Sequence, residues 1–312
     1  WRTYGIFFSF LCVMFRAYYV GITQTKILTV NSIVMLLSNV ALNYCLIFGK
    51  GGFPAAGIAG AAIASSVSEA VSLLFFIIYT SMTADKRKYG FRRAFTLRPH
   101  LLKGMLSISG WTMVQSFISV SIWFIFFLAI EHLGERPLAV TNIVRNISAL
   151  LIMVISAFAT TAGALISNQI GAGEQRCLFK TCGMTLKLTY AILIPLLIIL
   201  CLFPESVLRA FTDSPSLIAA SVNSVYVMAS STLIMAPSFI LFNAVSGTGN
   251  TRAGFIMEMI SLAVYTAVIY YGIIRLKPDV ALCWFSEHVY GVTLIFLAWW
   301  YLKSGKWRGK KV

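Results

Sequence analysis

Ionisable side chains inside apolar segments are the first candidates for chemistry in this sequence. Glu69, Glu258 and Glu287 each lie in a run of hydrophobic residues, and Arg145 lies in another. Such side chains are costly inside a membrane, and where they occur they commonly mark an ion or substrate pathway. A carboxylate there can carry a proton or Na⁺, and an arginine can neutralise a carboxylate or hold a polar substrate. A structural alternative stays open for each: a hydrogen bond between helices, or a side chain that reaches the interface.

Uncharged polar residues in the same segments form a second group. Asn142 is followed by Arg145 three positions later and by Asn146 four positions later, so a helix places all three on one face. Pro237 would free a backbone carbonyl and bend its helix, which makes it a candidate hinge. The polar residues either line a water-filled cavity or join helices. The candidates for an ion or substrate pathway are Glu69, Gln115, Asn142, Arg145, Asn146, Asn243, Glu258 and Glu287.

The composition indicates which elements must position these residues. Of 312 residues, 59% are hydrophobic and 11% are charged, and the mean hydropathy is +0.84. Soluble domains carry about 25% charged residues, so a soluble enzyme, a disordered chain and a secreted disulfide scaffold are excluded. The net charge of +15 would suit nucleic acid, but the basic residues cluster in short gaps between apolar runs. That pattern is typical of a polytopic membrane protein, and we expect no nucleic-acid partner.

Nine segments are apolar and long enough to span a membrane, for which about 20 residues are needed. The longest break between segments, near 81–102, leaves no room for a soluble domain, and no P-loop occurs. An ATP-driven pump with its nucleotide domain on this chain is therefore excluded. The predicted spans are 4–21, 27–48, 57–80, 103–130, 138–166, 181–203, 217–246, 253–275 and 280–302.

The distribution of Lys and Arg predicts the orientation of the spans. Seven basic residues fall in 81–103, which we place in the cytoplasm. Alternation of the spans then puts most other basic residues, including those of the C-terminal tail, on the same side. The sequence thus predicts a multi-pass protein of the inner (plasma) membrane with a cytoplasmic C-terminus. The first residue would lie outside, and since the chain does not begin with Met, we expect that an N-terminal part is missing.

A weak internal repeat relates the two parts of the chain. The segment from Phe15 to Lys26 resembles that from Phe242 to Arg252, and the pair Ser68-Glu69 resembles Ser286-Glu287. The matching segments run in the same direction through the membrane, which implies two parallel units related by an axis along the membrane normal. We predict that 1–80 holds the last three helices of an N-terminal lobe and that 81–102 is a basic cytoplasmic loop. A six-helix C-terminal lobe would follow at 103–303, then a basic tail at 304–312.

Three segments carry a resemblance to a known family. They are the stretch from Asn31 to Gly60, the sequence GALISNQIGAG at 163–173, and GTGNTR at 247–252. Together with the repeat, they resemble the multidrug and toxic compound extrusion (MATE) family. The resemblance implies an all-α, two-lobed transporter of parallel six-helix repeats, with about nine of twelve helices present. Members expel organic, often cationic and amphiphilic compounds in exchange for Na⁺ or H⁺, and the wider superfamily includes flippases for lipid-linked oligosaccharides.

The chain departs from part of the family pattern. The sodium-coupled branch has an acidic residue in the first helix of its second half, where this sequence has Gln115 and Ser116. Its second acidic position, in the tenth helix, falls near Met235. That cation site is therefore not carried over. In the fifth predicted span, at 138–166, the polar pair of the family falls on Asn142 and Asn146, which match it.

We predict a secondary active efflux transporter for organic compounds, driven by Na⁺ or H⁺ and working by alternating access. A flippase for a lipid-linked oligosaccharide is the alternative, and it would require a basic cavity around Arg145. An integral-membrane enzyme is a remote third class, because no HExxH, paired aspartates or Ser/His arrangement occurs in one span. The six cysteines form no CxxC pair, so no metal site is indicated. We expect no cofactor besides the coupling ion, a small organic substrate, contact with the lipid bilayer, and a monomer.

Overall fold

The computed structural model describes residues 1–83 and 99–308, and within them every regular element is a helix. The chain divides into two compact units, Trp1–Arg98 and Pro99–Val312, and each is described by itself. Nine helical stretches in the described residues are long and apolar enough to cross a membrane. The predicted all-α polytopic fold and its spans are therefore confirmed. Most of the predicted basic loop, at 84–98, and the last tail residues, at 309–312, lie outside the described residues.

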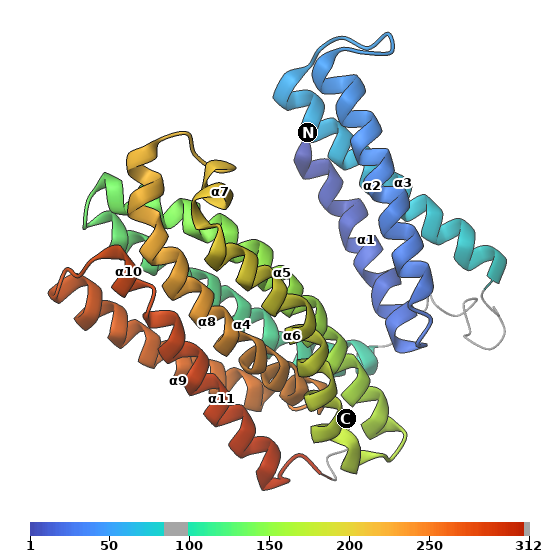
Figure 1. The fold of residues 1–312 in the computed structure, drawn as a ribbon. Helices are drawn as coiled ribbons and strands as arrows, with labels where there is room; N and C mark the ends of the chain where they lie inside the picture. The colour runs from blue at the N-terminus through green and yellow to red at the C-terminus, as the bar shows by residue number, and fades with distance from the viewer. Residues whose placement is uncertain (84–98, 309–312) are drawn as a thin grey trace. The chain divides into compact units, whose positions relative to one another are not determined.

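The first unit consists of three helices, α1 (Arg2–Gly21), α2 (Lys26–Phe48) and α3 (Gly57–Thr83) (Figure 1). α3 packs against both α1 and α2. Buried polar side chains join α3 to each of them: the hydroxyls of Tyr19 and Thr80 lie 2.8 Å apart, and the Asn31 amide donates to Ser72 at 2.8 Å. Such hydrogen bonds stabilise helix pairs in membranes, where the hydrophobic effect does not drive helices together.

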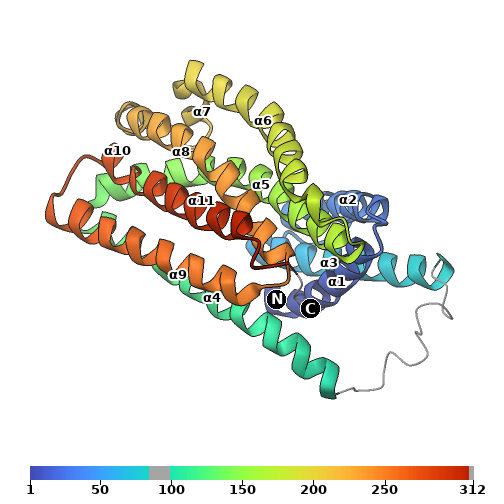
Figure 2. The same ribbon diagram turned by 90° about the horizontal axis from the view of Figure 1, so that it is seen from below.

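Within its described residues, the second unit contains six long helices and four short elements (Figure 2). Its elements are α4 (Pro99–Glu131), α5 (Glu135–Gly171), η2 (Gln175–Cys177), α6 (Leu178–Leu202), α7 (Pro204–Arg209), α8 (Pro215–Gly247), α9 (Thr251–Val268), η3 (Ile269–Arg275), α10 (Val280–Cys283) and α11 (Ser286–Ser304). The predicted span at 253–275 is α-helical only to Val268 and continues as a π-helix. The predicted span at 280–302 is interrupted by a turn at Trp284 and Phe285, where the Ser286 hydroxyl donates to the Cys283 carbonyl.

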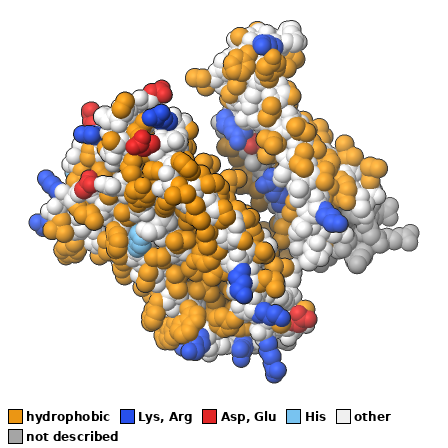
Figure 3. All heavy atoms as spheres, in the orientation of Figure 1, with side chains coloured by type: hydrophobic (Ala, Val, Ile, Leu, Met, Phe, Trp, Pro, Cys, Tyr) orange, Lys and Arg blue, Asp and Glu red, His pale blue; other side chains and the backbone are white. Residues whose placement is uncertain are grey.

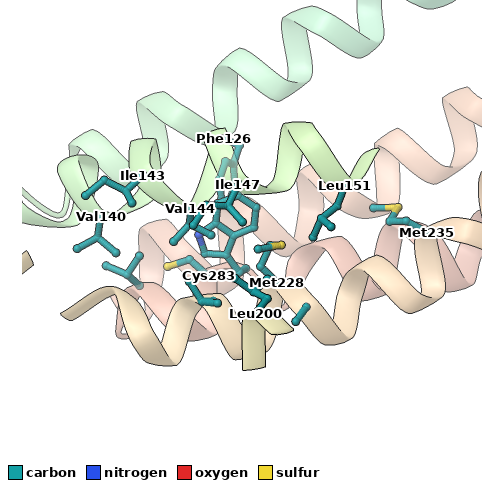
Figure 4. Close-up of a cluster of buried hydrophobic side chains, with 14 of the residues drawn as sticks. Phe126, Val140, Ile143, Val144, Ile147, Leu151, Leu200, Met228, Met235 and Cys283 are labelled. Carbon is teal, nitrogen blue, oxygen red and sulfur yellow. The ribbon is translucent and has the colours of Figure 1, made fainter. Parts of the chain in front are cut away.

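The core of the second unit lies where α4, α5, α6, α8 and α10 meet (Figure 4). Large apolar side chains from all five helices are buried there and pack closely, as protein interiors do in general. The side chains labelled in the figure are Phe126, Val140, Ile143, Val144, Ile147, Leu151, Leu200, Met228, Met235 and Cys283. This core fixes α5 and α8, the two helices that carry several of the predicted polar residues.

The helices α5 and α8 approach each other closely at two glycines. A Cβ atom added to Gly163 on α5 would lie 2.9 Å from the carbonyl oxygen of Asn243 on α8. One added to Gly247 on α8 would lie 2.5 Å from the carbonyl oxygen of Gly163. Both distances are too short for an ordinary contact, so only glycine permits this crossing. Small residues at helix crossings are characteristic of membrane proteins for this reason.

α8 runs without interruption through Pro237. Proline has no backbone N–H, so the carbonyl four residues earlier, that of Leu233, loses its partner within the helix. The Tyr190 hydroxyl on α6 donates to that carbonyl at 2.7 Å. A neighbouring helix thus satisfies the group that the proline leaves open, as membrane helices commonly require. The expectation that Pro237 is a hinge stays a prediction.

The surface agrees with a membrane location. Figure 3 shows hydrophobic side chains over much of the visible face of the second unit, with Lys and Arg at its lower end and at its upper left end. Many large apolar side chains are exposed, among them Phe117 at 76% and Met153 at 73%. Soluble monomers rarely expose apolar area on this scale, whereas contact with lipid tails accounts for it.

Candidate functional site

A cavity of about 480 Å³ lies within the second unit, and the side chains around it come from five helices. α4, α5, α8, α9 and α11 all contribute, and most of the wall is apolar or aromatic. A volume of this size suits a small organic molecule. The lining residues are Ser119, Val120, Trp123, Arg145, Ser148, Ala149, Ile152, Met153, Met235, Phe239, Glu258, Leu262, Tyr265, Glu287 and Tyr290. Three of the predicted pathway residues, namely Arg145, Glu258 and Glu287, are therefore brought together at one cavity.

Glu258 lies in the middle of α9 and is 4% exposed. Its Oε1 atom accepts hydrogen bonds from the Ser119 hydroxyl on α4 and from the Tyr290 hydroxyl on α11, each at 2.9 Å. Its Oε2 atom is buried and has no hydrogen-bond partner within the described residues. An unpartnered buried carboxylate oxygen is costly, so this atom is suited to accept a hydrogen bond or a cation from a guest.

Glu287 lies in the first turn of α11, and its Oε1 atom accepts a hydrogen bond from the Tyr265 hydroxyl on α9 at 2.8 Å. The two carboxylates therefore exchange partners between helices: the α9 tyrosine binds the α11 glutamate, and the α11 tyrosine binds the α9 glutamate. The rings of Tyr265 and Tyr290 meet edge to face, with centroids 5.8 Å apart. We call Glu258, Tyr265, Glu287 and Tyr290 the reciprocal clamp.

Arg145 projects from α5 toward the same cavity. Its guanidinium carbon lies 5.1 Å from the centroid of the Phe127 ring, which is close enough for a cation–π interaction. Among the residues that the structure describes, the one ion pair is Arg2–Glu69, so neither cavity carboxylate pairs directly with Arg145. The guanidinium thus keeps hydrogen-bond donors free for a guest.

Asn142, Asn146, Gln115 and Asn243 do not appear among the described residues that line the cavity. Asn142 donates to the backbone carbonyl of Leu138 at 3.1 Å, and Asn146, on the same helix, is exposed. Asn243 donates to the carbonyl of Phe239 at 2.9 Å. Gln115 is half-buried on α4, one turn before Ser119. Each of the two intrahelical bonds matches the structural alternative for such residues, and a transport role for these four stays a prediction.

Glu69 occupies a different environment, in the first unit. It is 9% exposed, and its Oε1 atom pairs with the Arg2 guanidinium at 2.7 Å. α1 comes close at this point because residue 5 is glycine: a Cβ there would lie 2.5 Å from Glu69 Oε2. A smaller cavity of about 220 Å³ borders the pair. Glu69 and Glu287 thus have different partners: an arginine that forms an ion pair in one unit, and a tyrosine hydroxyl that donates a hydrogen bond in the other.

Two partners of the predicted carboxylates were missed by sequence reasoning. Tyr290 follows Glu287 by three positions and shares its helix face, which is a usable signal, although the hydrogen bond goes to Glu258 instead. Arg2 gave no signal, because the sequence did not indicate that α1 and α3 pack with residues 2 and 69 side by side. In the described ranges, no group of three or more His, Cys, Asp or Glu residues could hold a metal ion.

The arrangement favours binding of a cation. Two carboxylates face one guanidinium across an apolar cavity, where charges are weakly screened and attract more strongly than in water. Trp123, Phe239 and Tyr265 add aromatic rings, whose faces attract cations. The same carboxylates can chemically accept a proton or Na⁺.

The fold and this site define a multi-pass helical membrane protein with a largely apolar cavity inside a helix bundle, to which a few charged side chains contribute. A family model, MatE, matches residues 112–271, which is half of the chain. The chain therefore belongs to the MatE (multidrug and toxic compound extrusion) family, and the resemblance seen in the sequence is confirmed.

Individual relatives agree with this assignment. The chain is 25% identical over 268 residues to the "Uncharacterized transporter YisQ" of Bacillus subtilis, covering 82% of this chain and 56% of that protein. It is 25% identical over 291 residues to the "Probable multidrug resistance protein NorM" of Thermotoga maritima, covering 88% of this chain and 59% of the relative. The chain thus spans about half the length of the curated relatives it matches.

Solved structures share the fold. An outward-facing multidrug resistance MATE family transporter of the MOP superfamily matches with a TM-score of 0.78 and 16% identity, over 90% of this chain and 62% of that one. A variant of the Vibrio cholerae MATE transporter VcmN matches with a TM-score of 0.79 and 12% identity, over 97% and 68% of the two chains. At these identities the likeness establishes the helical architecture alone.

Proposed function

We propose that the protein is a secondary active efflux transporter, which exports organic cations in exchange for H⁺ or Na⁺. The observation that carries the proposal is Glu258, a buried glutamate with a free carboxylate oxygen on a cavity of about 480 Å³. Family membership and relatives with multidrug resistance names support it. The protein acts as a multi-pass inner-membrane carrier with its C-terminus in the cytoplasm, and it transports its substrate without chemical change.

Exchange follows from competition at the carboxylate. When a proton or Na⁺ occupies Glu258, the cavity loses negative charge and binds a cationic guest less well. When the guest occupies the site, the ion is displaced. An ion gradient can then drive export, provided that the two ligands favour opposite facings of the protein. Glu258 suits this role because its hydrogen bonds reach Ser119 on α4 and Tyr290 on α11. Binding of an ion or a guest at Glu258 would therefore affect the hydrogen bonds that join α9 to α4 and α11.

A flippase for a lipid-linked oligosaccharide is the second candidate, and Arg145 is the residue in its favour. A basic cavity would hold the phosphate of such a lipid. The cavity has one guanidinium and two carboxylates, however, so its charge does not favour a polyanion. The charge balance supports the exporter.

Dye efflux from everted membrane vesicles tests the proposal. A fluorescent cationic dye is followed under an imposed proton or Na⁺ gradient without ATP, for the wild type, for Glu258→Gln and for Glu205→Gln. Glu205 is an exposed glutamate on the short helix α7 and serves as the matched control. We expect gradient-dependent transport that Glu258→Gln abolishes and Glu205→Gln preserves. Equal transport by both variants would exclude a coupling role for Glu258, and absence of transport by folded wild type would refute the exporter.

A further inference from the structure

Opposite charges that are not paired with each other line the same cavity in the second unit. The charged residues among its described lining are Glu258, Glu287 and Arg145. Oε1 of each glutamate accepts a hydrogen bond from a tyrosine hydroxyl, and Oε2 of Glu258 is buried without a hydrogen-bond partner in the described residues. Arg145 makes its contact with the face of Phe127, and no ion pair joins it to either glutamate in the described part of the chain. The protein thus leaves one acceptor and one donor group unmatched in a single apolar space.

The free oxygen of Glu258 and the guanidinium of Arg145 require different binding partners. The free oxygen of Glu258 accepts, so it suits an ammonium or another N–H donor. The guanidinium of Arg145 donates in a planar fork, so it suits a carboxylate or phosphate, which it can bind through two parallel hydrogen bonds. A plain cation satisfies Glu258 but leaves Arg145 without an acceptor and adds repulsion to it. A plain anion does the reverse.

We propose that Arg145 determines the charge preference of this cavity, and that the preferred guest is amphoteric. Such a guest carries a cationic nitrogen, which binds Glu258, and an anionic group, which binds Arg145. A flat apolar body joins the two groups and packs against Trp123 and Phe239. This inference rests on the proposed function for the identity of the site, but it names a class of substrate that a carboxylate-only cavity would not select.

The chain offers a matched test by ligand and by residue. The ligands are a rhodamine with a free carboxylate, which is amphoteric, and its methyl ester, which is a cation of nearly the same shape. Binding of each dye to the purified full chain in detergent is measured by fluorescence anisotropy. The proteins are the wild type, Arg145→Gln, Arg145→Lys and Arg209→Gln. Arg209 is exposed at the end of α7 and controls for loss of a positive charge.

We expect the wild type and Arg209→Gln to bind the carboxylate dye about tenfold more tightly than the ester, as one charge-assisted pair provides. Arg145→Gln should remove this preference while it leaves the affinity for the ester equal or higher, and Arg145→Lys should keep part of the preference. If Arg145→Gln does not fold, the affinities of the wild type and of Arg145→Lys for the two dyes still show whether the preference for the carboxylate dye depends on Arg145.

The outcomes separate this inference from the proposed function. Binding of the ester as tightly as the carboxylate dye by the wild type overturns the amphoteric guest but leaves cation export standing. A preference that persists in Arg145→Gln overturns the role of Arg145. Binding of neither dye by folded wild-type protein overturns both proposals together.

Discussion

Replacement of Gly163 by alanine tests whether the close crossing of α5 and α8 holds the second unit together. The added Cβ would lie 2.9 Å from the Asn243 carbonyl oxygen, whereas ordinary contacts begin at 3.4 Å. The two helices must therefore separate by roughly 0.5 Å, and because the obstacle is backbone, no side-chain rotation relieves it. Overpacking of this kind costs about 1–3 kcal/mol. The substitution also gains about 1 kcal/mol of helix propensity, which must be subtracted.

Gly183→Ala provides the matched control. Gly183 also lies inside a helix, α6, and no atom lies within 4 Å of the place that its Cβ would take. The Gly183→Ala variant should gain the same helix propensity as Gly163→Ala without the steric cost. We therefore expect Gly163→Ala to be less stable than Gly183→Ala by about 1–3 kcal/mol. Gly247→Ala, whose Cβ would lie 2.5 Å from a carbonyl oxygen, should be the least stable of the three.

Unfolding of the purified protein in mixed micelles, titrated with a denaturing detergent, measures this order. Far-ultraviolet circular dichroism reports loss of helix, and the midpoint is compared among the three variants at equal protein concentration. Equal midpoints for Gly163→Ala and Gly183→Ala would refute the reasoning, because they would mean that α5 and α8 separate at no cost.

Four further substitutions have defined outcomes. Tyr190→Phe leaves the carbonyl of Leu233 without its donor and should lower stability in the same titration by about 1 kcal/mol. Tyr265→Phe and Tyr290→Phe each break one bond of the reciprocal clamp at a cost of about 1 kcal/mol, and since the rings touch, their double variant should depart from additivity. An additive double variant would show that the two bonds are independent. Glu69→Gln should change stability by only about 0–1 kcal/mol, because its arginine partner is 58% exposed, and dye affinity in the second unit should not change. A large loss of dye affinity would contradict the separation of the two sites.

Hydropathy sufficed to predict the spans because each span is a local property of about 20 consecutive residues. The short helix α7 was not predicted, since it is too short to show a helical period, and neither was the turn that separates α10 from α11. The π-helix at Ile269–Arg275 was also missed. Its hydrogen-bond pattern depends on how the chain is held at both ends, and apolar periodicity does not report it.

The site was predicted in its parts but not in its assembly. The sequence indicated Glu258 and Glu287 as costly membrane carboxylates, and the cavity includes both. Their partners could not be derived, because Ser119 and Glu258 lie 139 residues apart and meet only through the packing of α4 on α9. Periodicity within one helix shows which residues share a face. It does not show which faces of two helices meet.

The proline in α8 has a mechanical consequence for the cavity. Pro237 lies between Met235 and Phe239, and both of these residues line the cavity wall. At this level the helix lacks one of its own hydrogen bonds and relies on a hydroxyl from α6. A wall with one fewer internal bond would yield at lower force than an unbroken helix, so if Pro237 is the predicted hinge, bending of α8 there would widen or narrow the cavity. Such bending would let the cavity that holds Glu258 and Arg145 accept guests of different thickness, which is a physical basis for broad selectivity.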